Sequence, residues 1–339
     1  MIRRPASGSG VWRVWLVEEE QILGLVQAVL GAVAPRAVRM TDGQQSEVWE
    51  VALPEHLMVR IHPDPRHFAD TRHNLDVLTG LGLPVPRVLA AGLTRTRPPR
   101  AYLILTAIPG RDLRHELSSM TEPQMTRLAE RIASFQTTVG TLPSGTGYGY
   151  VGIGGRGAHG SWWDVLGGVP DAPLRAESGG AAARGLWVRV RRLVAAHEPY
   201  LRSVPPMCFL DDITVKNVLV QGGELQGLVD FDCVCYGDPL YWLSLTAVGV
   251  VSDVGLRELF YVRELRRFLS LTDEQRLVSL LYAAWIALGF VERFATGETQ
   301  EWSARMLGSI EDWVAELESG GTPLHGDAGG WKHGSKRDD

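Results

Sequence analysis

The stretch that decides the fold is Cys208-Phe-Leu-Asp-Asp-Ile-Thr-Val-Lys-Asn-Val-Leu-Val220, followed by a Gly-Gly turn and then by Leu225-Gln-Gly-Leu-Val-Asp-Phe-Asp232. Two apolar runs with the composition of β-strands flank this tight turn. A polar loop before the first strand carries Asp212 and Asn217 with four residues between them, and the second strand ends at Asp230. The sequence therefore predicts a β-hairpin with functional polar groups before its first strand and after its second.

These polar residues follow the order used in Mg²⁺-dependent phosphoryl transfer on kinase-like folds: an Asp, an Asn after four residues, a hairpin and an Asp-Phe-x segment. That chemistry needs a carboxylate that orients the acceptor hydroxyl and oxygen ligands that hold Mg²⁺ against the phosphates. Asp212 suits the first task as catalytic base, and Asn217 and Asp230 suit the second as metal ligands. Each of them alone is also a common turn residue, but their order in one stretch favours the functional interpretation.

Composition excludes several classes of protein. The chain has 339 residues, 45% of them hydrophobic, and a net charge of -5, which is typical of a globular chain of about two domains or of one large two-lobed domain. Without an excess of basic residues, nucleic-acid and anionic-membrane partners are not expected. Three cysteines and an N-terminus without the pattern of a signal peptide predict a cytoplasmic protein. No apolar run approaches the length of a membrane span, and the strongest, 281–291, predicts a core helix. The oligomeric state stays open.

Hydrophobic periodicity changes character along the chain. Before residue 106, helical spacing predicts helices over 17–34 and 67–79, and short β-like runs separated by turn signals predict strands over 37–40, 47–52, 57–61, 87–91 and 101–106. Capping boxes at Thr121-x-x-Gln124 and Thr272-x-x-Gln275 open apolar helices further on. The remainder is therefore predicted to be mostly helical, apart from one short strand pair.

Two segments lack a clear period. Residues 141–180 are rich in Gly and Trp and are predicted to form a long irregular insertion, which suits an acceptor-specific lid. Residues 319–339 contain Gly, His and charged residues without apolar spacing, and we expect a disordered tail there.

Over residues 20–318 the sequence resembles the aminoglycoside phosphotransferase and choline kinase superfamily of small-molecule kinases. The resemblance rests on Val59-Arg60-Ile61, Leu83-Pro84-Val85-Pro86, residues 103–110, the catalytic stretch and Gly237-Asp238-Pro239. It implies an α+β, bilobal protein-kinase-like fold. A small antiparallel-sheet N-lobe with one inserted helix would occupy 1–105, and a larger, mostly helical C-lobe with the hinge, catalytic loop and acceptor site would occupy 106–318.

The resemblance also implies a nucleotide site, with ATP or GTP as co-substrate. Its base would bind the hinge backbone around Thr106 and Ile108, and Arg60 would hold the phosphates from the third strand. Gly43 and Ser46 lie in the turn where a phosphate-covering loop belongs. This assignment rests on the position of the turn and not on a motif.

Three departures from the family pattern bear on the site. The usual partner of the strand cation is a Glu of the inserted helix, but this chain has Asn74 there, with Asp70 one turn earlier as a substitute. The usual His-Gly-Asp is replaced by Leu210-Asp211-Asp212, and the four-residue gap to the Asn keeps the last Asp as base. Lys216 is either a further phosphate contact or a solvated loop lysine.

The implied activity is Mg²⁺-dependent transfer of the nucleotide γ-phosphate to a hydroxyl of a small molecule. The acceptor expected from the family is an antibiotic or related secondary metabolite, which would make the protein a resistance kinase. The alternatives are a metabolic kinase for an amino alcohol or sugar, and a nucleotide-binding protein without turnover. Acidic residues outnumber arginines over 241–318, a weak indication of a cationic acceptor. A protein kinase is disfavoured because no Ala-Pro-Glu segment follows Asp230.

Overall fold

The computed structural model describes residues 17–40, 46–167, 180–294 and 300–320. The chain divides into two compact units: an N-terminal unit, Arg3–Gly110 with Gln226–Cys233, and a C-terminal unit, which contains Arg111–Leu225 and Val234–Asp339. The hairpin strand after the Gly-Gly turn therefore leads from one unit into the other. Most of the predicted tail, 321–339, and Gly43 of the predicted phosphate-covering turn lie outside the described residues.

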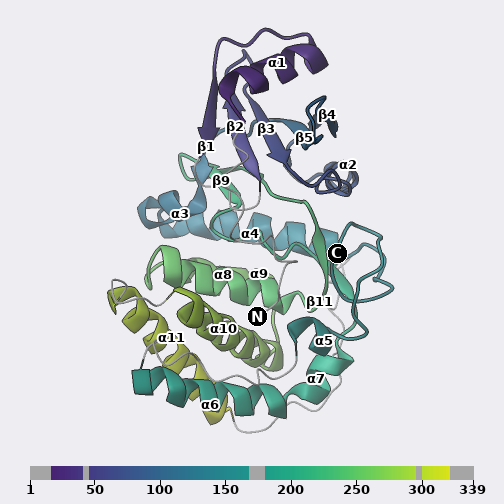
Figure 1. The fold of residues 1–339 in the computed structure, drawn as a ribbon. Helices are drawn as coiled ribbons and strands as arrows, with labels where there is room; N and C mark the ends of the chain where they lie inside the picture. The colour runs from purple at the N-terminus through teal and green to yellow at the C-terminus, as the bar shows by residue number, and fades with distance from the viewer. Residues whose placement is uncertain (1–16, 41–45, 168–179, 295–299, 321–339) are drawn as a thin grey trace, which may run out of the picture. The chain divides into compact units, whose positions relative to one another are not determined.

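The N-terminal unit is built on a five-stranded antiparallel sheet with strand order β1-β2-β3-β5-β4 (Figure 1). Its strands cover the predicted positions closely: β1 (Ala37–Met40), β2 (Glu47–Val51), β3 (Leu57–His62), β4 (Val88–Leu93) and β5 (Ala101–Thr106). In β3, Val59 and Ile61 are buried while Arg60 between them is only partly buried. Successive side chains of a strand point to opposite faces, so Arg60 lies on the face opposite to these two core residues.

Two helices accompany this sheet. α1 (Glu19–Leu30) begins with a capping box between Glu18 and Gln21 and buries Ile22 and Val26 in one cluster with the sheet residues Trp49, Val51 and Val59. Burying each large apolar side chain contributes about 1.5 to 3 kcal/mol, so α1 is held mainly by its apolar face. α2 (Thr71–Gly80) begins later than predicted, because residues 65–70 form turns rather than a helix.

The C-terminal unit is mostly helical, as the periodicity predicts. Both predicted capping boxes are formed: Gln124 N donates to Thr121 Oγ1 at 3.4 Å, and Gln275 N donates to Thr272 Oγ1 at 3.2 Å. The helices are α3 (Leu113–Glu116), α4 (Glu122–Val139), α5 (Trp162–Leu166), α6 (Gly180–Ala196), α7 (Glu198–Ser203), α8 (Leu240–Asp253), α9 (Leu259–Phe268), α10 (Asp273–Phe294) and α11 (Gln300–Ser319), with a short 3₁₀ helix at Leu117–Ser119.

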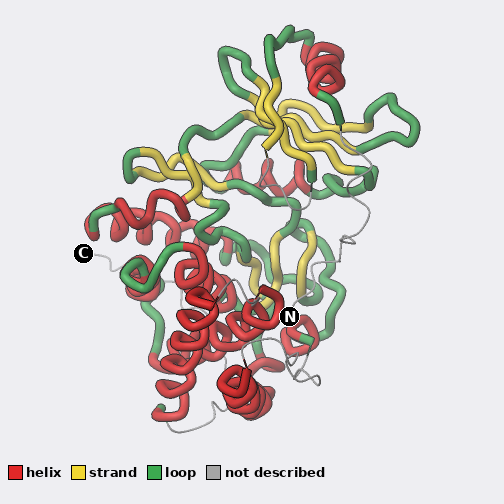
Figure 2. The backbone as a smooth tube through the Cα atoms, turned by 60° about the vertical axis from the view of Figure 1, so that its left-hand side comes forward, coloured by secondary structure: helices red, strands yellow, loops and turns green. Residues whose placement is uncertain are grey.

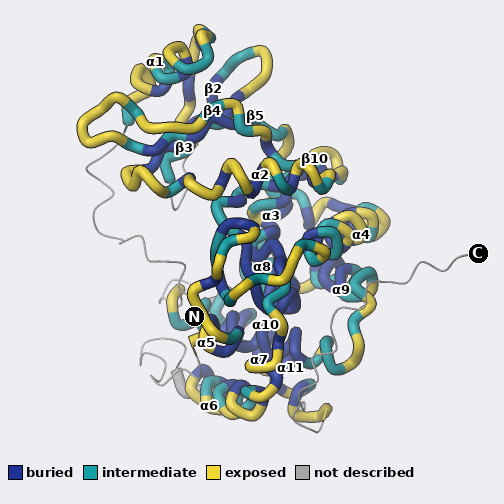
Figure 3. The backbone as a smooth tube through the Cα atoms, turned by 90° about the vertical axis from the view of Figure 1, so that its right-hand side faces the viewer, coloured by how far each residue is buried: buried dark blue, intermediate teal, exposed yellow. Residues whose placement is uncertain are grey.

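Helices α8 and α10 form the centre of this unit, and both are dark blue in Figure 3. By length and hydropathy alone α10 is able to cross a membrane, but 67% of its most apolar window is buried inside the protein. This burial confirms the prediction of a core helix over 281–291.

Two small sheets lie outside the five-stranded sheet, and sequence periodicity largely missed them (Figure 2). One has the order β10-β9-β6, with β6 (Arg111–Asp112), β9 (Val218–Gln221) and β10 (Glu224–Leu228); β9 and β10 are the predicted hairpin. The other has the order β7-β11-β8, with β7 (Gly149–Val151), β8 (Met207–Phe209) and β11 (Val234–Gly237). Strands of two to four residues carry no period of their own and exist only through partners distant in sequence.

The described part of the predicted irregular insertion, 141–167, contains regular structure. It contributes β7 and α5, and its Trp162 is fully buried and donates from Nε1 to Tyr282 Oη at 2.8 Å. Tyr282 and Tyr200 in turn donate to the Asp238 carboxylate at 2.8 and 3.0 Å. A Cβ at Gly237 would collide with the Trp162 ring, so this position accepts only glycine. In the described part of the insertion, Trp162 and Trp163 thus pack into the core.

Candidate active site

The loop between β8 and β9 places the predicted base and one predicted metal ligand in one turn. Asn217 Nδ2 donates to the Asp212 carbonyl at 2.8 Å, and Asn217 N donates to the Thr214 carbonyl at 3.2 Å. The four-residue spacing is what lets the Asn side chain reach back to the residue that begins the turn. With its amide nitrogen used in this way, Asn217 retains Oδ1 as an oxygen that suits a cation.

Three elements hold the backbone of this loop. Gln136 of α4 donates from Nε2 to the Leu210 carbonyl at 2.7 Å and accepts from Leu210 N at 3.1 Å. Trp242 of α8 donates from Nε1 to the Ile213 carbonyl at 3.1 Å, and the Arg114 N–H of α3 donates to the Val215 carbonyl at 2.9 Å. The loop is therefore fixed on both sides of Asp212, which is the preorganisation that a positioned acid–base group requires.

Asp211 and Asp212 differ in exposure. Asp211 is only 4% exposed, whereas Asp212 is partly exposed. A general base must come within hydrogen-bond reach of the group that it deprotonates. Exposure thus favours Asp212, the residue that the spacing selects, over its buried neighbour.

Sequence reasoning missed Gln136, although a signal was present. Met125, Leu128 and Ile132 mark the buried stripe of α4, and Gln136 continues that stripe at the next helical position with 3% exposure. A buried polar side chain needs partners. A glutamine at a core position of an apolar stripe therefore predicts a specific contact, here with the catalytic loop.

We expect Gln136→Leu to lower the free energy of unfolding by about 2 to 5 kcal/mol, because it leaves the buried N–H and C=O of Leu210 without partners. Gln136→Glu keeps an acceptor for Leu210 N but turns a buried carboxylate oxygen towards the Leu210 carbonyl, so it should also lose stability. Chemical denaturation measures both, with Ser134→Ala on the exposed face of the same helix as control. Equal stability of all four proteins would contradict the assigned role.

In the N-terminal unit, Arg60 lies among the groups that the sequence predicted to surround phosphates and metal. Its guanidinium pairs with Asp232 through Nη1 at 2.9 Å and Nη2 at 2.6 Å, and Nη2 lies 3.4 Å from Asp230 Oδ1. Nε donates to Ser46 Oγ at 3.2 Å, and the ring of Phe68 lies 5.1 Å from the guanidinium carbon. The structure thus brings Arg60 and Ser46 together.

The carboxylate partner of Arg60 in the structure differs from the one expected on the inserted helix. Asn74 is fully buried, and its Nδ2 donates to the backbone carbonyls of Phe231 at 3.0 Å and Asp232 at 3.3 Å. Asp70 is exposed at the N-terminus of α2. The carboxylate that pairs closely with Arg60 comes instead from Asp232, which the sequence interpretation left without a role.

The Asp230-Phe231-Asp232 segment carries two carboxylates in different environments. Burial opposes the charge of Asp232, but Arg60 and His67 outweigh it and hold the pKa of this carboxyl well below its usual range. Asp230 has a left-handed backbone with φ 71°, which Asp tolerates better than most residues, and its side chain is 34% exposed. Asp230 is therefore the more accessible of the two carboxylates.

The predicted hinge offers one backbone amide for a ligand. Thr106 N donates to the Arg87 carbonyl and Ala107 N to the His56 carbonyl, both at 3.0 Å. Among the described residues Ile108 N has no such acceptor. Of the predicted hinge positions, Ile108 is the one whose N–H is available to a nucleotide base.

Lys216 has a protein partner of its own. Its Nζ lies 2.9 Å from Asp253 Oδ2 at the end of α8, and the lysine side chain is 49% exposed. Exposed pairs are weak, but this one favours the interpretation of Lys216 as a loop lysine over that of a phosphate contact.

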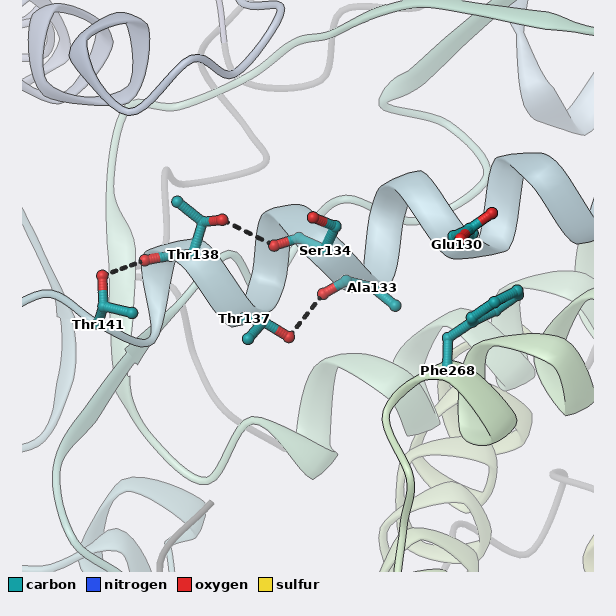
Figure 4. A pocket seen from close by; sticks show the side chains of 7 residues that line it. All are labelled: Glu130, Ala133, Ser134, Thr137, Thr138, Thr141 and Phe268. Carbon is teal, nitrogen blue, oxygen red and sulfur yellow. Dashed lines mark hydrogen bonds between the residues drawn. The ribbon is translucent and has the colours of Figure 1, made fainter. Parts of the chain in front are cut away.

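A groove on the C-terminal unit contains none of the predicted site residues (Figure 4). The hydroxyls of Thr137 and Thr138 point to carbonyls of their own helix, at 2.9 Å each, and Thr141 Oγ1 donates to the Thr138 carbonyl at 2.7 Å. These threonines have used their donors, so the groove has little left with which to orient a polar ligand. Its lining includes Glu130, Ser134, Thr137, Thr138, Thr141 and Phe268.

The fold has clear counterparts among solved structures. The apo form of a thermostable mutant of aminoglycoside phosphotransferase APH(4)-Ia matches with a TM-score of 0.64 and 17% identity, over 88% of this chain and 100% of that chain. The GDP complex of wild-type aminoglycoside 2'-phosphotransferase-IIIa matches with a TM-score of 0.59 and 14% identity, over 88% and 99%. A putative fructosamine-3-kinase from Haemophilus somnus 129PT matches with a TM-score of 0.55 and 15% identity, over 87% and 97%. These matches confirm the α+β kinase-like fold.

Sequence comparison assigns the family. No curated protein matches the chain. The model of the phosphotransferase enzyme family, in contrast, matches residues 36–277, which include the sheet, the hinge, the catalytic loop and the Asp230-Phe231-Asp232 segment. With most of its length matched by this model, the chain belongs to the phosphotransferase enzyme family.

Proposed function

We propose that the protein is a cytoplasmic, Mg²⁺-dependent kinase that transfers the γ-phosphate of ATP or GTP to a hydroxyl of a small molecule. The preferred acceptor is a hydroxylated antibiotic or related secondary metabolite, which phosphorylation would inactivate. The observation that carries the proposal is the loop of Asp212 and Asn217, held by Gln136, Trp242 and Arg114. Such rigidity around a partly exposed carboxylate suits a reaction that depends on positioning.

In this proposal Asp212 accepts a hydrogen bond from the acceptor hydroxyl and takes its proton. The hydroxyl oxygen forms a bond to the γ-phosphorus as the bond between that phosphorus and the β,γ-bridging oxygen breaks. The nucleoside diphosphate leaves with the electrons of that bond. A positioned acid–base group of this kind contributes about 10²- to 10⁴-fold to a rate.

Each of the two predicted metal ligands has donor chemistry that suits a magnesium ion. Asn217 supplies an amide oxygen and Asp230 a partly exposed carboxylate, both of the hard oxygen type that Mg²⁺ prefers, and Mg²⁺ commonly takes only one or two protein ligands beside phosphates and water. We assign these two residues to hold it. When bound, the ion neutralises charge on the phosphates.

Arg60 and Ile108 are assigned to the nucleotide. The guanidinium of Arg60 presents a planar array of donors that matches phosphate oxygens. Ser46 Oγ accepts a hydrogen bond from Nε of the same guanidinium at 3.2 Å. The Ile108 N–H would donate to the base, since the two preceding amides are used inside the unit.

The acceptor class rests on the solved relatives in fold. One similar structure is a ternary complex of an aminoglycoside phosphotransferase mutant with ADP and hygromycin B, at 16% identity. The acidic excess over 241–318 does not support a cationic acceptor, because several of these carboxylates pair with cations outside that range. Glu311 and Glu318 pair with Arg189 of α6, and Asp253 pairs with Lys216.

A second candidate is a metabolic kinase for an amino alcohol or sugar, favoured by the match to the putative fructosamine-3-kinase. A binding protein without turnover is less well supported than the sequence suggested. It was suggested by the missing His before the catalytic Asp and by Asn74 in place of a helix Glu. The second of these loses weight, because Arg60 has a carboxylate partner in Asp232.

The test has two arms. Expression in a sensitive host across antibiotic classes should protect against at least one class, whereas the Asp212→Asn variant at equal expression should not. Purified protein with ATP or GTP and Mg²⁺ is then given the protective compound, amino alcohols and sugars, with phosphorylated product detected by mass spectrometry. Protection against no class, together with phosphorylation of an amino alcohol or sugar, would favour the metabolic kinase. Nucleotide binding without any transfer would favour the binding protein.

A further inference from the structure

We propose that Asp232 is the positioning residue for Arg60: the carboxylate that orients the phosphate-binding cation comes from the segment after the metal ligand and not from helix α2. This inference rests on the proposed function, because it assigns Arg60 to the nucleotide phosphates. It concerns only residues of the N-terminal unit.

The pair has the geometry of a strong interaction. Two nitrogens of Arg60 reach two oxygens of Asp232, at 2.9 and 2.6 Å, which is the bidentate arrangement of guanidinium and carboxylate. The side chains are only 11% and 16% exposed, so solvent screens the pair less than it screens a surface pair. A guanidinium held in this way has less rotamer freedom to lose when phosphate binds.

Both carboxylate oxygens of Asp232 are engaged. Oδ1 accepts from Arg60 Nη1 and from Thr71 Oγ1 at 3.0 Å, and Oδ2 accepts from Arg60 Nη2. His67 Nε2 lies 3.5 Å from Oδ2. Asp230 has one contact at 3.4 Å to the same arginine and twice the exposure. The two carboxylates thus have different roles: Asp232 orients the arginine, and Asp230 is the proposed metal ligand.

Helix α2 contributes neutral donors instead of a charge. Thr71 and Asn74 are both fully buried, and they donate to the Asp232 carboxylate and to the carbonyls of Phe231 and Asp232. A glutamate at position 74 would turn a carboxylate towards two carbonyl oxygens, which is repulsive. The amide of Asn74 is therefore compatible with the backbone that carries Asp232. The negative charge beside Arg60 comes from Asp232 and not from helix α2.

The test is nucleotide affinity, measured by calorimetry with Mg²⁺ present, for the triphosphate and for the nucleoside alone. Asp232→Asn keeps the size and the acceptor for Thr71 but removes the charge. We expect it to bind the triphosphate about tenfold more weakly, within the range of coupling between contacting charges, and to bind the nucleoside as the wild type does. Asp232→Glu restores the charge and should bind the triphosphate more tightly than Asp232→Asn.

A double-mutant cycle separates positioning from a structural role. If Asp232 acts through Arg60, adding Asp232→Asn to Arg60→Ala should weaken triphosphate binding no further. Asp76→Asn, an exposed carboxylate on α2, is the matched control and should bind both ligands normally. If Asp232→Asn does not fold, Asp232→Ser keeps an acceptor for Thr71 and carries the same expectation.

Unchanged triphosphate affinity in the neutral variant would overturn the inference, as would equal losses for triphosphate and nucleoside, or additive losses in the cycle. The outcome for the wild type distinguishes the two proposals. If the wild type and the Asp232→Asn variant bind the triphosphate equally well, the positioning role is refuted and the proposed function is not. Wild-type protein that binds no triphosphate refutes the proposed function and this inference with it.

Discussion

Replacing Asp212 by asparagine is expected to lower kcat at least about a hundredfold, the usual scale for a positioned acid–base group. The amide cannot take the proton of the acceptor hydroxyl. The melting temperature should stay nearly unchanged, because the loop is held by backbone contacts from Gln136, Trp242 and Asn217 and not by the Asp212 carboxylate alone. Turnover is measured with the acceptor from the substrate panel, or as hydrolysis of the nucleotide by water.

Two variants complete this experiment. Asp312→Asn removes an exposed carboxylate of α11 and should turn over normally. Asp211→Asn distinguishes the tandem carboxylates: loss of turnover there in a folded protein, with normal turnover in Asp212→Asn, would shift the base by one residue and refute the spacing argument.

The second large effect is expected at Asp230, where Asp230→Asn should abolish the Mg²⁺-dependent part of nucleotide stabilisation. In a thermal-shift experiment, wild-type protein with ATP or GTP should gain melting temperature when Mg²⁺ is added, because a ligand that binds only the folded state stabilises it. The variant lacks the anionic ligand, so Mg²⁺ should add little.

Asparagine is the appropriate replacement at this position because the backbone has φ 71°, which Asn adopts more readily than Ala. Asp230→Ala should lose the same Mg²⁺ effect and, in addition, some stability without ligand. If Mg²⁺ still raises the melting temperature of both variants with nucleotide as it does in the wild type, Asp230 is not a metal ligand.

Much of the fold was predictable because local pattern and tertiary structure agree. The strands β1, β2, β3 and β5 and the helices opened by capping boxes lie where alternation and helical spacing place them. The strands β7, β8 and β11 were not predictable in this way, since three or four residues have no period and their partners lie far along the chain. The place of Trp162 was not predictable for the same reason, because whether it fills a core or lines a pocket depends on what packs against it.

The sequence by itself determined the family, the kinase-like fold and the order Asp212, Asn217 and Asp230, because the spacing of these residues along one hairpin is a property of the chain. Only the tertiary structure decided which carboxylate orients Arg60 and which side chain holds the catalytic loop. The first pair joins residues 172 positions apart and the second joins residues 74 positions apart. Contacts over such separations leave no local pattern, since they depend on how distant segments pack and which buried polar atoms still need a partner.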